Sequence, residues 1–451
     1  MTTMTAPPEI TGKLLTPTSD GYDEARSLFN SMIDRRPAMI AQCATAEDVA
    51  TCIRYARETG SDFAVRGGGH SVAGTSTLDD GLVIDLRLMH QVEPDVPGRT
   101  VRVGGGATMS HLDRALEPHG LATTGGRVST TGVGGFVLGG GSGWLDRKFG
   151  LACDNLVSVE LVTADGRMVT ASEEENPELF WGLHGGGGNF GVATAMTLRT
   201  YELPVVSAAL LLFLPQDAEQ AIRTYRDLLD EIGDDASGGC IYITAPPEDF
   251  VPEHLVGEMV LLTLVTHCGP QAELEPKIAP LLGMQPAGRL VVELPYAEMN
   301  CMIDDPPGQR NYWSAEHLHS LPDEAVSAFV AAAEGLLVPS SSQHVLFPGG
   351  GAAARATTDY PLPWRSAPWV AHPFAVWEDP ADDEQCIRWT RSVREAMKPW
   401  ATGDVYLNFI GEEGGSRIRA GYGEGWDRLV AVKREWDPDN VFHHNQNVPP
   451  S

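Results

Sequence analysis

The sequence predicts a protein of the α+β class with two domains and a C-terminal tail of different composition. In the first part of the chain, clusters of glycine alternate with Val-, Leu- and Ile-rich runs typical of strands, and 28 of the 49 glycines lie between Gly60 and Gly191. From about Pro204 the glycine density falls, and helical stretches alternate with strand-like runs. From about Val405 glycine and aromatic residues return, which marks the tail.

A β-α-β unit is expected ahead of the first glycine cluster. The segment PAMIAQC (37–43) is typical of a strand, and Thr45 with Asp48 forms a capping box that would open a helix. Gly60 is a plausible end of that helix, and DFAVR (62–66) then predicts a second strand that leads into RGGGH. The helix would bury the apolar stripe of Val49, Cys52, Ile53 and Ala56.

Further elements follow from local patterns. Strands are predicted in GLVIDL (81–86), RTVRVG (99–104), NLVSVELVTADGRMVTAS (155–172), GGCIYITAP (238–246) and QHVLFPG (343–349). Asp165 and Gly166 indicate a hairpin, and residues 323–337 predict a helix. Pro438 and several asparagines predict an ordered loop at the end of the chain.

Composition excludes several classes of partner and site. The chain carries 32 Lys and Arg against 61 Asp and Glu, a net charge of −29, so we expect no binding to nucleic acid or to an anionic membrane. The start of the chain lacks the basic and apolar run of a secretory signal, which predicts a soluble, cytoplasmic protein. The seven cysteines form no C-x-x-C pair, and no metal site is predicted.

Two glycine motifs differ in their context. Gly186-x-Gly188-x-x-Gly191 satisfies a dinucleotide pattern, but a strand-like segment follows where that fingerprint needs a helix, so a nicotinamide site is not expected. RGGGHS comes directly after a strand, and its backbone N–H groups are able to converge on a phosphate anion. The alternative is that RGGGHS is only a tight turn.

Several segments together carry a family resemblance. VRGGGHSVAG, TGVGGFVLGGGSGWLDRKFGLACDNLVSVELVTADG, NPELFWGLHGGGGNFGV, VYLNF and DPDNVFHHNQNVPP occur in this order along the chain. In combination they resemble the berberine-bridge-enzyme-like FAD-linked oxidases, within the superfamily of vanillyl-alcohol oxidase and p-cresol methylhydroxylase. The resemblance spans nearly the whole chain.

This resemblance implies an FAD-binding domain of the p-cresol methylhydroxylase type in two parts. Residues 1–204, with a core at about 35–203, would form the first part and residues 405–451 would complete the FAD site. Residues 205–404 would form the inserted α+β substrate domain, an antiparallel sheet covered by helices. The residues implied to bind FAD are Arg66, Gly67, Gly68, Gly69, His70, Ser71, Gly74, Gly132, Gly135, Gly139, Gly140, Gly141, Val192, Asn408 and Asn445.

The resemblance also implies how FAD is attached. His70 matches the histidine that family members link covalently to the flavin 8-methyl carbon, the alternative being an unmodified turn histidine. Many relatives carry a second link through a cysteine, but Val128 occupies that position here. We therefore expect FAD to be attached through His70 only.

Two residues are implied to act in catalysis. Thr131 matches the position that faces the flavin where dioxygen approaches, although a threonine that only packs in a strand is equally consistent. Tyr406 begins the Tyr-x-Asn motif, whose tyrosine lies over the flavin beside the substrate. Tyr406 would act as a base, or orient a substrate hydroxyl, or serve only as a core residue.

The expected function is oxidation of a small organic substrate by hydride transfer to FAD N5, with O2 as acceptor and release of H2O2. One alternative is a flavin-dependent oxygenase that inserts oxygen into its substrate. The other is a flavin or small-molecule binder without turnover. Candidates for lining the substrate site are Tyr242, Gln343, Tyr312 and Trp313.

Overall fold

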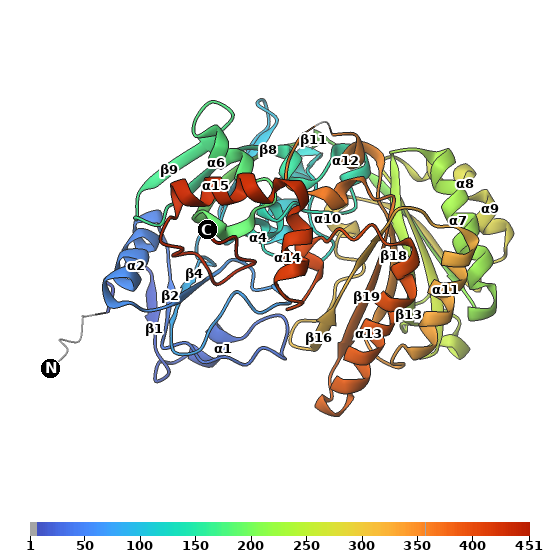
Figure 1. Ribbon diagram of the computed structural model, residues 1–451. Coiled ribbons are helices and arrows are strands. Elements are labelled where there is room, and N and C mark those ends of the chain that lie inside the picture. Colours follow the sequence, from blue (N-terminus) through green and yellow to red (C-terminus); the bar gives the residue numbers. More distant parts are fainter. Residues whose placement is uncertain (1–6, 357) are drawn as a thin grey trace.

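A computed structural model describes residues 7–356 and 358–451 of the chain. It has two halves that lie side by side, each built on its own sheets (Figure 1). The mixture of helices and largely antiparallel sheets confirms the predicted α+β class.

The first half begins with a four-stranded sheet in the order β1-β2-β4-β3. β2 and β3 each pair in parallel with β4, and a helix connects β2 to β3, which confirms the predicted β-α-β unit. Its elements are β1 (Lys13–Leu15), α1 (Tyr22–Arg26), β2 (Met39–Gln42), α2 (Ala46–Thr59), β3 (Phe63–Arg66) and β4 (Leu82–Asp85).

Helix α2 ends as its sequence predicts and begins with one difference. The Thr45 side chain accepts a hydrogen bond from the Asp48 N–H at 3.1 Å, and Gly60 takes the left-handed conformation at the C-terminus. The Asp48 carboxylate does not close a capping box on Thr45. It accepts instead from the N–H groups of Ala44, Thr11 and Gly12, and so ties the N-terminal strand to this helix.

A five-stranded antiparallel sheet, β5-β6-β10-β8-β9, completes this half with a short β7–β11 pair. Strand β10 follows directly after the Gly186–Gly191 motif, which confirms that the motif opens no helix. The elements are β5 (Val92–Asp95), β6 (Thr100–Gly104), α3 (Met109–Leu116), β7 (Leu121–Ala122), α4 (Val133–Leu138), α5 (Asp146–Phe149), β8 (Leu156–Val162), β9 (Met168–Ser172), α6 (Pro177–Gly182), β10 (Val192–Arg199) and β11 (Tyr201–Glu202).

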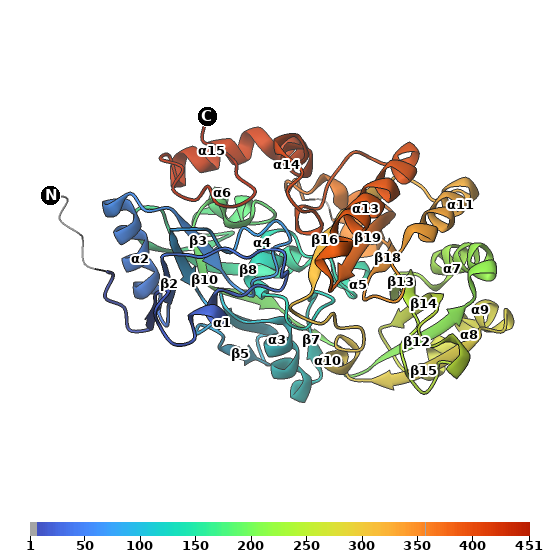
Figure 2. The same cartoon turned by 90° about the horizontal axis from the view of Figure 1, so that it is seen from below.

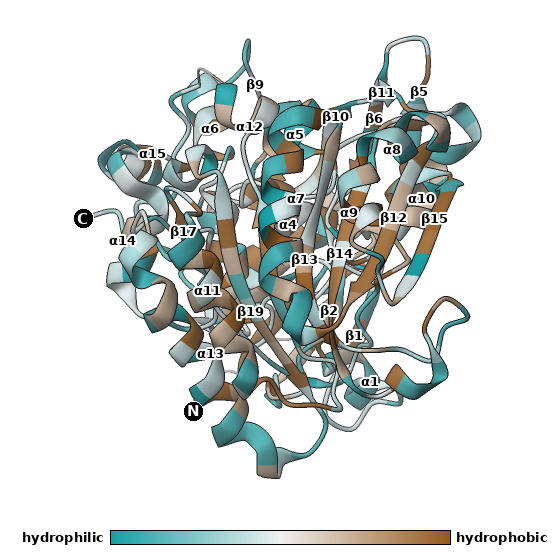
Figure 3. Ribbon diagram, turned by 90° about the vertical axis from the view of Figure 1, so that its right-hand side faces the viewer, coloured by the Kyte–Doolittle hydropathy of each residue, from teal (hydrophilic) through white to brown (hydrophobic). Residues whose placement is uncertain are grey.

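The second half is an antiparallel sheet of eight strands with helices along its outer face (Figure 2). In Figure 3 the helices α7, α11 and α13 lie in front of hydrophobic strands of this sheet. The strands are β12 (Val206–Phe213), β13 (Ala236–Thr244), β14 (Met259–His267), β15 (Gly288–Leu294), β16 (Arg310–Trp313), β17 (Glu316–Leu318), β18 (Gln343–Pro348) and β19 (Trp369–Trp377). The helices are α7 (Ala218–Ile232), α8 (Gln271–Lys277), α9 (Ala279–Gly283), α10 (Tyr296–Met299), α11 (Asp323–Ala332), α12 (Gly351–Arg355) and α13 (Asp383–Met397).

The tail returns to the first half. It forms α14 (Gly415–Tyr422) and α15 (Trp426–Trp436), which sequence patterns did not predict, and α15 lies beside α6 in both Figure 1 and Figure 2. The predicted loop at the end of the chain is present from residue 437 and buries Phe442 and Val448.

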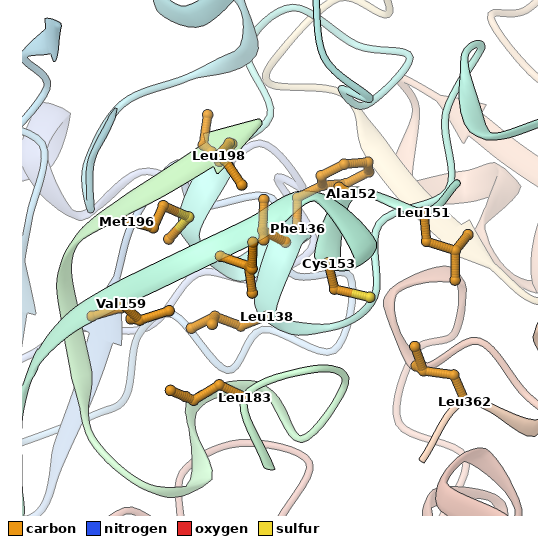
Figure 4. Close-up of a cluster of buried hydrophobic side chains, with 14 of the residues drawn as sticks. Phe136, Leu138, Leu151, Ala152, Cys153, Val159, Leu183, Met196, Leu198 and Leu362 are labelled. Atoms are coloured by element: carbon orange, nitrogen blue, oxygen red, sulfur yellow. The ribbon is translucent and has the colours of Figure 1, made fainter. Parts of the chain in front are cut away.

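Apolar side chains from distant segments form the core of the first half. Phe136, Leu138 and Cys153 meet Val159 and Met196 in the cluster shown in Figure 4. The same cluster includes Tyr406, so packing of the core also fixes the position of this tail residue. No helix within the described residues combines the length and the apolar character needed to cross a membrane.

Candidate active site

A cavity of about 350 Å³ lies where the two halves and the tail meet. Four groups of residues form its wall: the loop after β3, the segment that leads into α4, the glycine-rich segment before β10, and two stretches of the tail. The inner face of the eight-stranded sheet closes the remaining side. The glycine motifs that stand far apart in the sequence therefore converge on one space.

The loop after β3 presents free hydrogen-bond donors to this cavity. The backbone N–H groups of residues 68–71 donate to no acceptor among the described residues. Gly69 adopts a positive φ of 77°, which a residue with a side chain rarely takes, so the loop makes a tight turn at the cavity wall. Consecutive unsatisfied N–H groups in such a turn form an anion site suited to a pyrophosphate.

Arg66 does not line the cavity, contrary to the sequence expectation. Its guanidinium is buried on the other side of the strand end and donates to the carbonyls of Ala25 and Ser27, the latter at 2.6 Å. Arg66 therefore holds the loop in place and makes no direct contact with the cavity.

His70 is fixed by two neighbours at the cavity wall. Its Nε2 lies 2.8 Å from Thr130 Oγ1, and its ring stacks on Phe29 at a centroid distance of 4.0 Å. Burial, assisted by the nearby Arg66 guanidinium, lowers the pKa of His70 to about 3. The imidazole is therefore neutral at physiological pH, with Nδ1 free of hydrogen bonds to the described residues.

Glycines near the cavity serve two different purposes. A Cβ on Gly68 would lie 2.3 Å from the Gly132 nitrogen, so these two loops cross in direct backbone contact. In contrast, a Cβ on Gly135, Gly187 or Gly188 would meet no protein atom within 4 Å, although all three line the cavity. Space beside these glycines is thus open to a ligand.

Three other glycines expected at the cofactor do not line the cavity. Gly74 belongs to a turn whose carbonyl accepts from Arg35, and Gly140 packs against Trp364 and Leu362. Gly141 lies behind the wall, where its N–H donates to the Tyr406 hydroxyl at 3.1 Å. All three have positive φ values, which explains the glycines by backbone conformation.

Tyr406 places its hydroxyl oxygen among three donors. The N–H groups of Gly141 and Ser142 donate to it at 3.1 and 3.4 Å, and Asn408 Nδ2 donates at 3.1 Å. Burial raises the pKa of Tyr406 to about 12, while these three donors and the charge of Arg127 oppose the increase. The Tyr406 O–H donates to no acceptor among the described residues, and Tyr406 lines the cavity.

The remaining cofactor candidates lie at the cavity. Thr131, Gly132, Gly139, Val192, Asn408 and Asn445 all line it, and so does Val128 in the position of the second link. The Thr131 hydroxyl makes no hydrogen bond with the described residues, while its backbone carbonyl accepts from Met109. Asn445 donates to the carbonyls of Gly188 and Phe442, which joins the tail to the glycine-rich segment.

The residues predicted to line the substrate site lie on two different faces of the large sheet. Gln343 and Trp313 line the cavity, but Tyr242 and Tyr312 do not. Successive residues of a strand point to opposite faces, and Tyr242 is paired in register with His344, on the helix-covered face. Tyr242 is 1% exposed and packs near Phe329, so its expected part in substrate binding is wrong.

Sequence patterns missed several residues of the cavity wall. Arg127 lies against the ring of Phe347 at 4.2 Å, and its guanidinium donates to the carbonyls of Ser142 and Gly143. Asp305 and His372 also line the cavity. None of them stands in a motif, and only the folded chain brings them to this wall.

Comparison with known proteins agrees with this geometry. Residues 37–172 match the family described as FAD binding domain, and residues 405–449 match the family described as berberine and berberine like. The chain is 32% identical over 468 residues to (R)-6-hydroxynicotine oxidase of Paenarthrobacter nicotinovorans, covering 99% of this chain and 98% of that protein. It belongs to the berberine-bridge-like family of FAD-linked oxidoreductases. An uncharacterised FAD-linked oxidoreductase of Bacillus subtilis is 30% identical, with 98% of both chains covered.

Solved structures show the same fold for this FAD-linked oxidoreductase. 6-Hydroxy-D-nicotine oxidase from Arthrobacter nicotinovorans superimposes with a TM-score of 0.88 at 29% identity, covering 99% of both chains. Berberine bridge enzyme from Eschscholzia californica superimposes with a TM-score of 0.84 at 22% identity, with 97% of both chains covered. The second likeness bears on the fold alone.

The cavity of this FAD-linked oxidoreductase fits its cofactor. Unsatisfied N–H groups at residues 68–71 suit a pyrophosphate, and the open space beside Gly135, Gly187 and Gly188 admits a large planar group. The protein is therefore an FAD-dependent oxidoreductase whose site the two halves and the tail share.

Proposed function

We propose that this enzyme oxidises a small organic substrate, with O2 as electron acceptor and H2O2 as product. When bound, FAD accepts a hydride at N5 and passes the electrons on to O2. Residues 1–204 and 405–451 would hold the cofactor, and residues 205–404 would present the substrate to it.

The observation that carries this proposal is the environment of Tyr406. Tyr406 lines the cavity, three N–H donors approach its hydroxyl oxygen, and its own O–H has no acceptor among the described residues. The same three donors stabilise a phenolate, so Tyr406 is suited to take a proton from a substrate hydroxyl or amine as hydride leaves the adjacent carbon. A protein that only stored flavin would have no need of such a group.

Arg127 supports the role of Tyr406 as a proton acceptor. It is buried, and its charge favours the ionised form of Tyr406. The guanidinium is held by Ser142 and Gly143, whose segment also supplies a donor to Tyr406. The cation and the tyrosine are therefore linked through one short stretch of backbone.

We propose a single covalent bond between FAD and His70. The neutral imidazole, held by Thr130 and Phe29, has the form needed for a nucleophile. Val128, in the position of the second link, has no reactive atom. Flavin should stay with the polypeptide after acid denaturation, and peptide mass mapping should find it on one peptide, containing His70. Flavin that separates from the denatured chain would contradict the tether.

The second candidate function is a flavin-dependent oxygenase, and Thr131 is the residue that supports it. Thr131 lines the cavity, and its hydroxyl has no hydrogen-bond partner among the described residues, so it is a donor that could hold an oxygen species there. Oxygen insertion needs a reactive species sheltered from water, for which one hydroxyl is little support. The geometry thus favours release of peroxide.

The test begins with the purified protein. Its absorbance spectrum should show bound flavin, and a substrate screen without oxygen should reveal compounds that bleach it. The reaction is then run under ¹⁸O₂ with a coupled peroxide assay. Peroxide equal to substrate consumed, with unlabelled product, supports the oxidase, whereas label in the product without matching peroxide would establish the oxygenase.

A further inference from the structure

A single carboxylate lies on the wall of the cavity. Among the described residues that line it, Asp305 is the only acidic one, and it comes from the loop between α10 and β16. The residue is 8% exposed, so its side chain faces the enclosed space and not bulk water. Burying a carboxylate without a cation costs free energy, so a cationic partner is expected for Asp305.

One oxygen of Asp305 is held and the other is free. Gln343 Nε2 donates to Asp305 Oδ1 at 2.8 Å, which fixes the carboxylate against strand β18. Asp305 Oδ2 accepts no hydrogen bond from any described residue. The neighbouring Asp304 differs, because both of its oxygens accept from Ser129. Of these two carboxylates, only Asp305 has an oxygen free of hydrogen bonds to the described residues.

Aromatic rings surround the same part of the wall. Phe374 lies opposite Gln343 in the register of β18 and β19, and opposite Trp313 in the register of β16 and β19. The rings of Trp313 and Phe374 approach to a centroid distance of 4.1 Å, and both line the cavity. Aromatic faces attract cations, so the rings and the carboxylate favour the same kind of ligand.

No basic group among the described residues serves as the cation partner of Asp305. Arg127, the only Arg or Lys that lines the cavity among the described residues, donates to Ser142 and Gly143 and lies 3.9 Å from Asp146. His372 Nδ1 donates to the Ser314 carbonyl at 2.7 Å, and burial lowers the pKa of His372 to about 4, so its ring is uncharged. Burial and the nearby Asp304 raise the pKa of Asp305 to about 7, as expected for a carboxylate without a cation.

We propose that Asp305 is the specificity-determining residue of this enzyme and that it binds a positively charged nitrogen of the substrate. Gln343 positions its carboxylate, and Trp313 and Phe374 provide aromatic surface for the ammonium and its carbon substituents. The substrate class is thus an alkylammonium compound with an apolar or aromatic body. This inference rests on the proposed oxidation of a small organic molecule at the same site.

The test compares charged and neutral ligands of the same shape. Calorimetric titration of the flavin-containing protein at about pH 8 would use phenylalkylamines of increasing chain length and the matched phenylalkanols, since alkylamines are charged at that pH. A charge-assisted hydrogen bond in a buried site predicts that the best amine binds at least about tenfold more tightly than its alcohol. Equal binding of the two, or no binding of any amine, would overturn the proposal.

Variants assign the preference to one residue. Asp305→Asn keeps the shape and removes the charge, so the preference for the amine should disappear, and Asp305→Glu should restore part of it. Asp249→Asn makes the same change at an exposed site outside the cavity and should leave the preference unchanged. An amine preference that survives in Asp305→Asn would assign recognition to another group.

Failure of this inference is distinguishable from failure of the proposed function. Calorimetry measures binding without turnover, so amine binding that depends on Asp305, together with flavin that no substrate bleaches, would contradict the oxidation alone. Flavin bleached only by neutral substrates, with peroxide formed, would contradict the role of Asp305 alone.

Discussion

The hydroxyl of Tyr406 shows how single hydrogen bonds prepare a buried residue for chemistry. Burial by itself disfavours the phenolate and raises the pKa of Tyr406 to about 12. Two backbone N–H groups and the Asn408 amide oppose this effect, and the glycine at 139 leaves room for the amide, because a Cβ there would lie 2.6 Å from Asn408 Nδ2. The Tyr-x-Asn motif therefore acts as one unit.

Replacement of Tyr406 by Phe removes the proposed proton acceptor and changes the cavity shape very little. Loss of such a group typically slows the step about 10² to 10⁴-fold, so anaerobic flavin reduction should fall by at least the lower figure, with the flavin spectrum intact. Stopped-flow absorbance measures the rate. Tyr312→Phe is the matched control, because that hydroxyl faces Arg391 outside the cavity and its loss should leave the rate unchanged. A Tyr406→Phe rate within threefold of the original would leave Tyr406 as a packing residue.

The pH profile separates a base from an orienting hydroxyl. A base acts only when deprotonated, and with a pKa of about 12 for Tyr406 the deprotonated fraction rises with pH throughout the neutral and mildly alkaline range. Flavin reduction should therefore accelerate by about tenfold per pH unit over that range. The profile should be measured above about pH 8, because Asp305 gains its proton near its own pKa of about 7. A flat profile would show that Tyr406 donates a hydrogen bond and takes no proton.

Lys433 of helix α15 joins the tail to the first half by a buried hydrogen bond to the Asn189 carbonyl, and it forms an ion pair with Asp437 of the same tail. Lys433 and Asp437 are both fully buried, with Nζ 2.7 Å from Oδ2. The ammonium also donates to the carbonyls of Asn189 and Phe442, each at 2.8 Å. This single side chain thus joins the helix, the glycine-rich segment before β10 and the loop that carries Asn445.

Breaking this pair should loosen the tail. Lys433→Met leaves the Asp437 carboxylate buried without its cation, and such changes cost about 3–5 kcal/mol. The free energy of unfolding, measured by urea denaturation, should fall by about that amount, and flavin content should decrease. Lys398→Met, at an exposed pair with Glu395, is the control and should cost less than about 1 kcal/mol. Similar decreases in the free energy of unfolding for the two variants would contradict the stabilising role of Lys433.

Sequence patterns predicted where many strands and helices lie, but not which face of a strand points to the cavity. Strands such as β2, β3 and β10 follow from apolar runs next to glycine, and α2 follows from its apolar stripe and end signals. Helices α14 and α15 were missed because glycines interrupt or border them and their apolar residues face a neighbour known only from the fold. Tyr242 was misplaced because a strand buried on both faces gives no alternation from which to choose the cavity side.

Some residues of the candidate site could be located from the sequence, and others could not. The motif loops and Tyr406 could be located from sequence because they stand in segments that resemble those of a known family. Asp305 and Arg127 could not be located, since both depend on contacts with residues distant in sequence: Asp305 with Gln343, and Arg127 with Phe347. Tertiary packing decides which polar residues reach the cavity.

At the scale of the whole molecule, the cavity joins parts of the chain that are otherwise separate in sequence. Loop 67–71, the segment into α4, the segment before β10, the inner face of the large sheet and the tail all border one space. A ligand that contacts all of them stabilises their common arrangement, because it binds the folded chain and not the unfolded one. A covalent tether makes this stabilisation independent of the ligand concentration in solution.

His70→Ala should therefore change how the stability of the protein depends on FAD. With the proposed tether, the cofactor of the original protein cannot dissociate, so the melting temperature should not change when free FAD is added. In His70→Ala the cofactor is free to dissociate, and adding FAD to about 100 times its dissociation constant should restore about 2.7 kcal/mol relative to the flavin-free variant. Thermal melts across a series of FAD concentrations measure this, with His443→Ala, an exposed histidine of the final loop, as the control. Two results would contradict a tether at His70. One is a melting temperature of His70→Ala that does not change when FAD is added. The other is a melting temperature of the original protein that rises with added FAD. The FAD concentration at which the melting temperature of His70→Ala begins to rise would measure how tightly the non-covalent contacts of the cavity hold the cofactor.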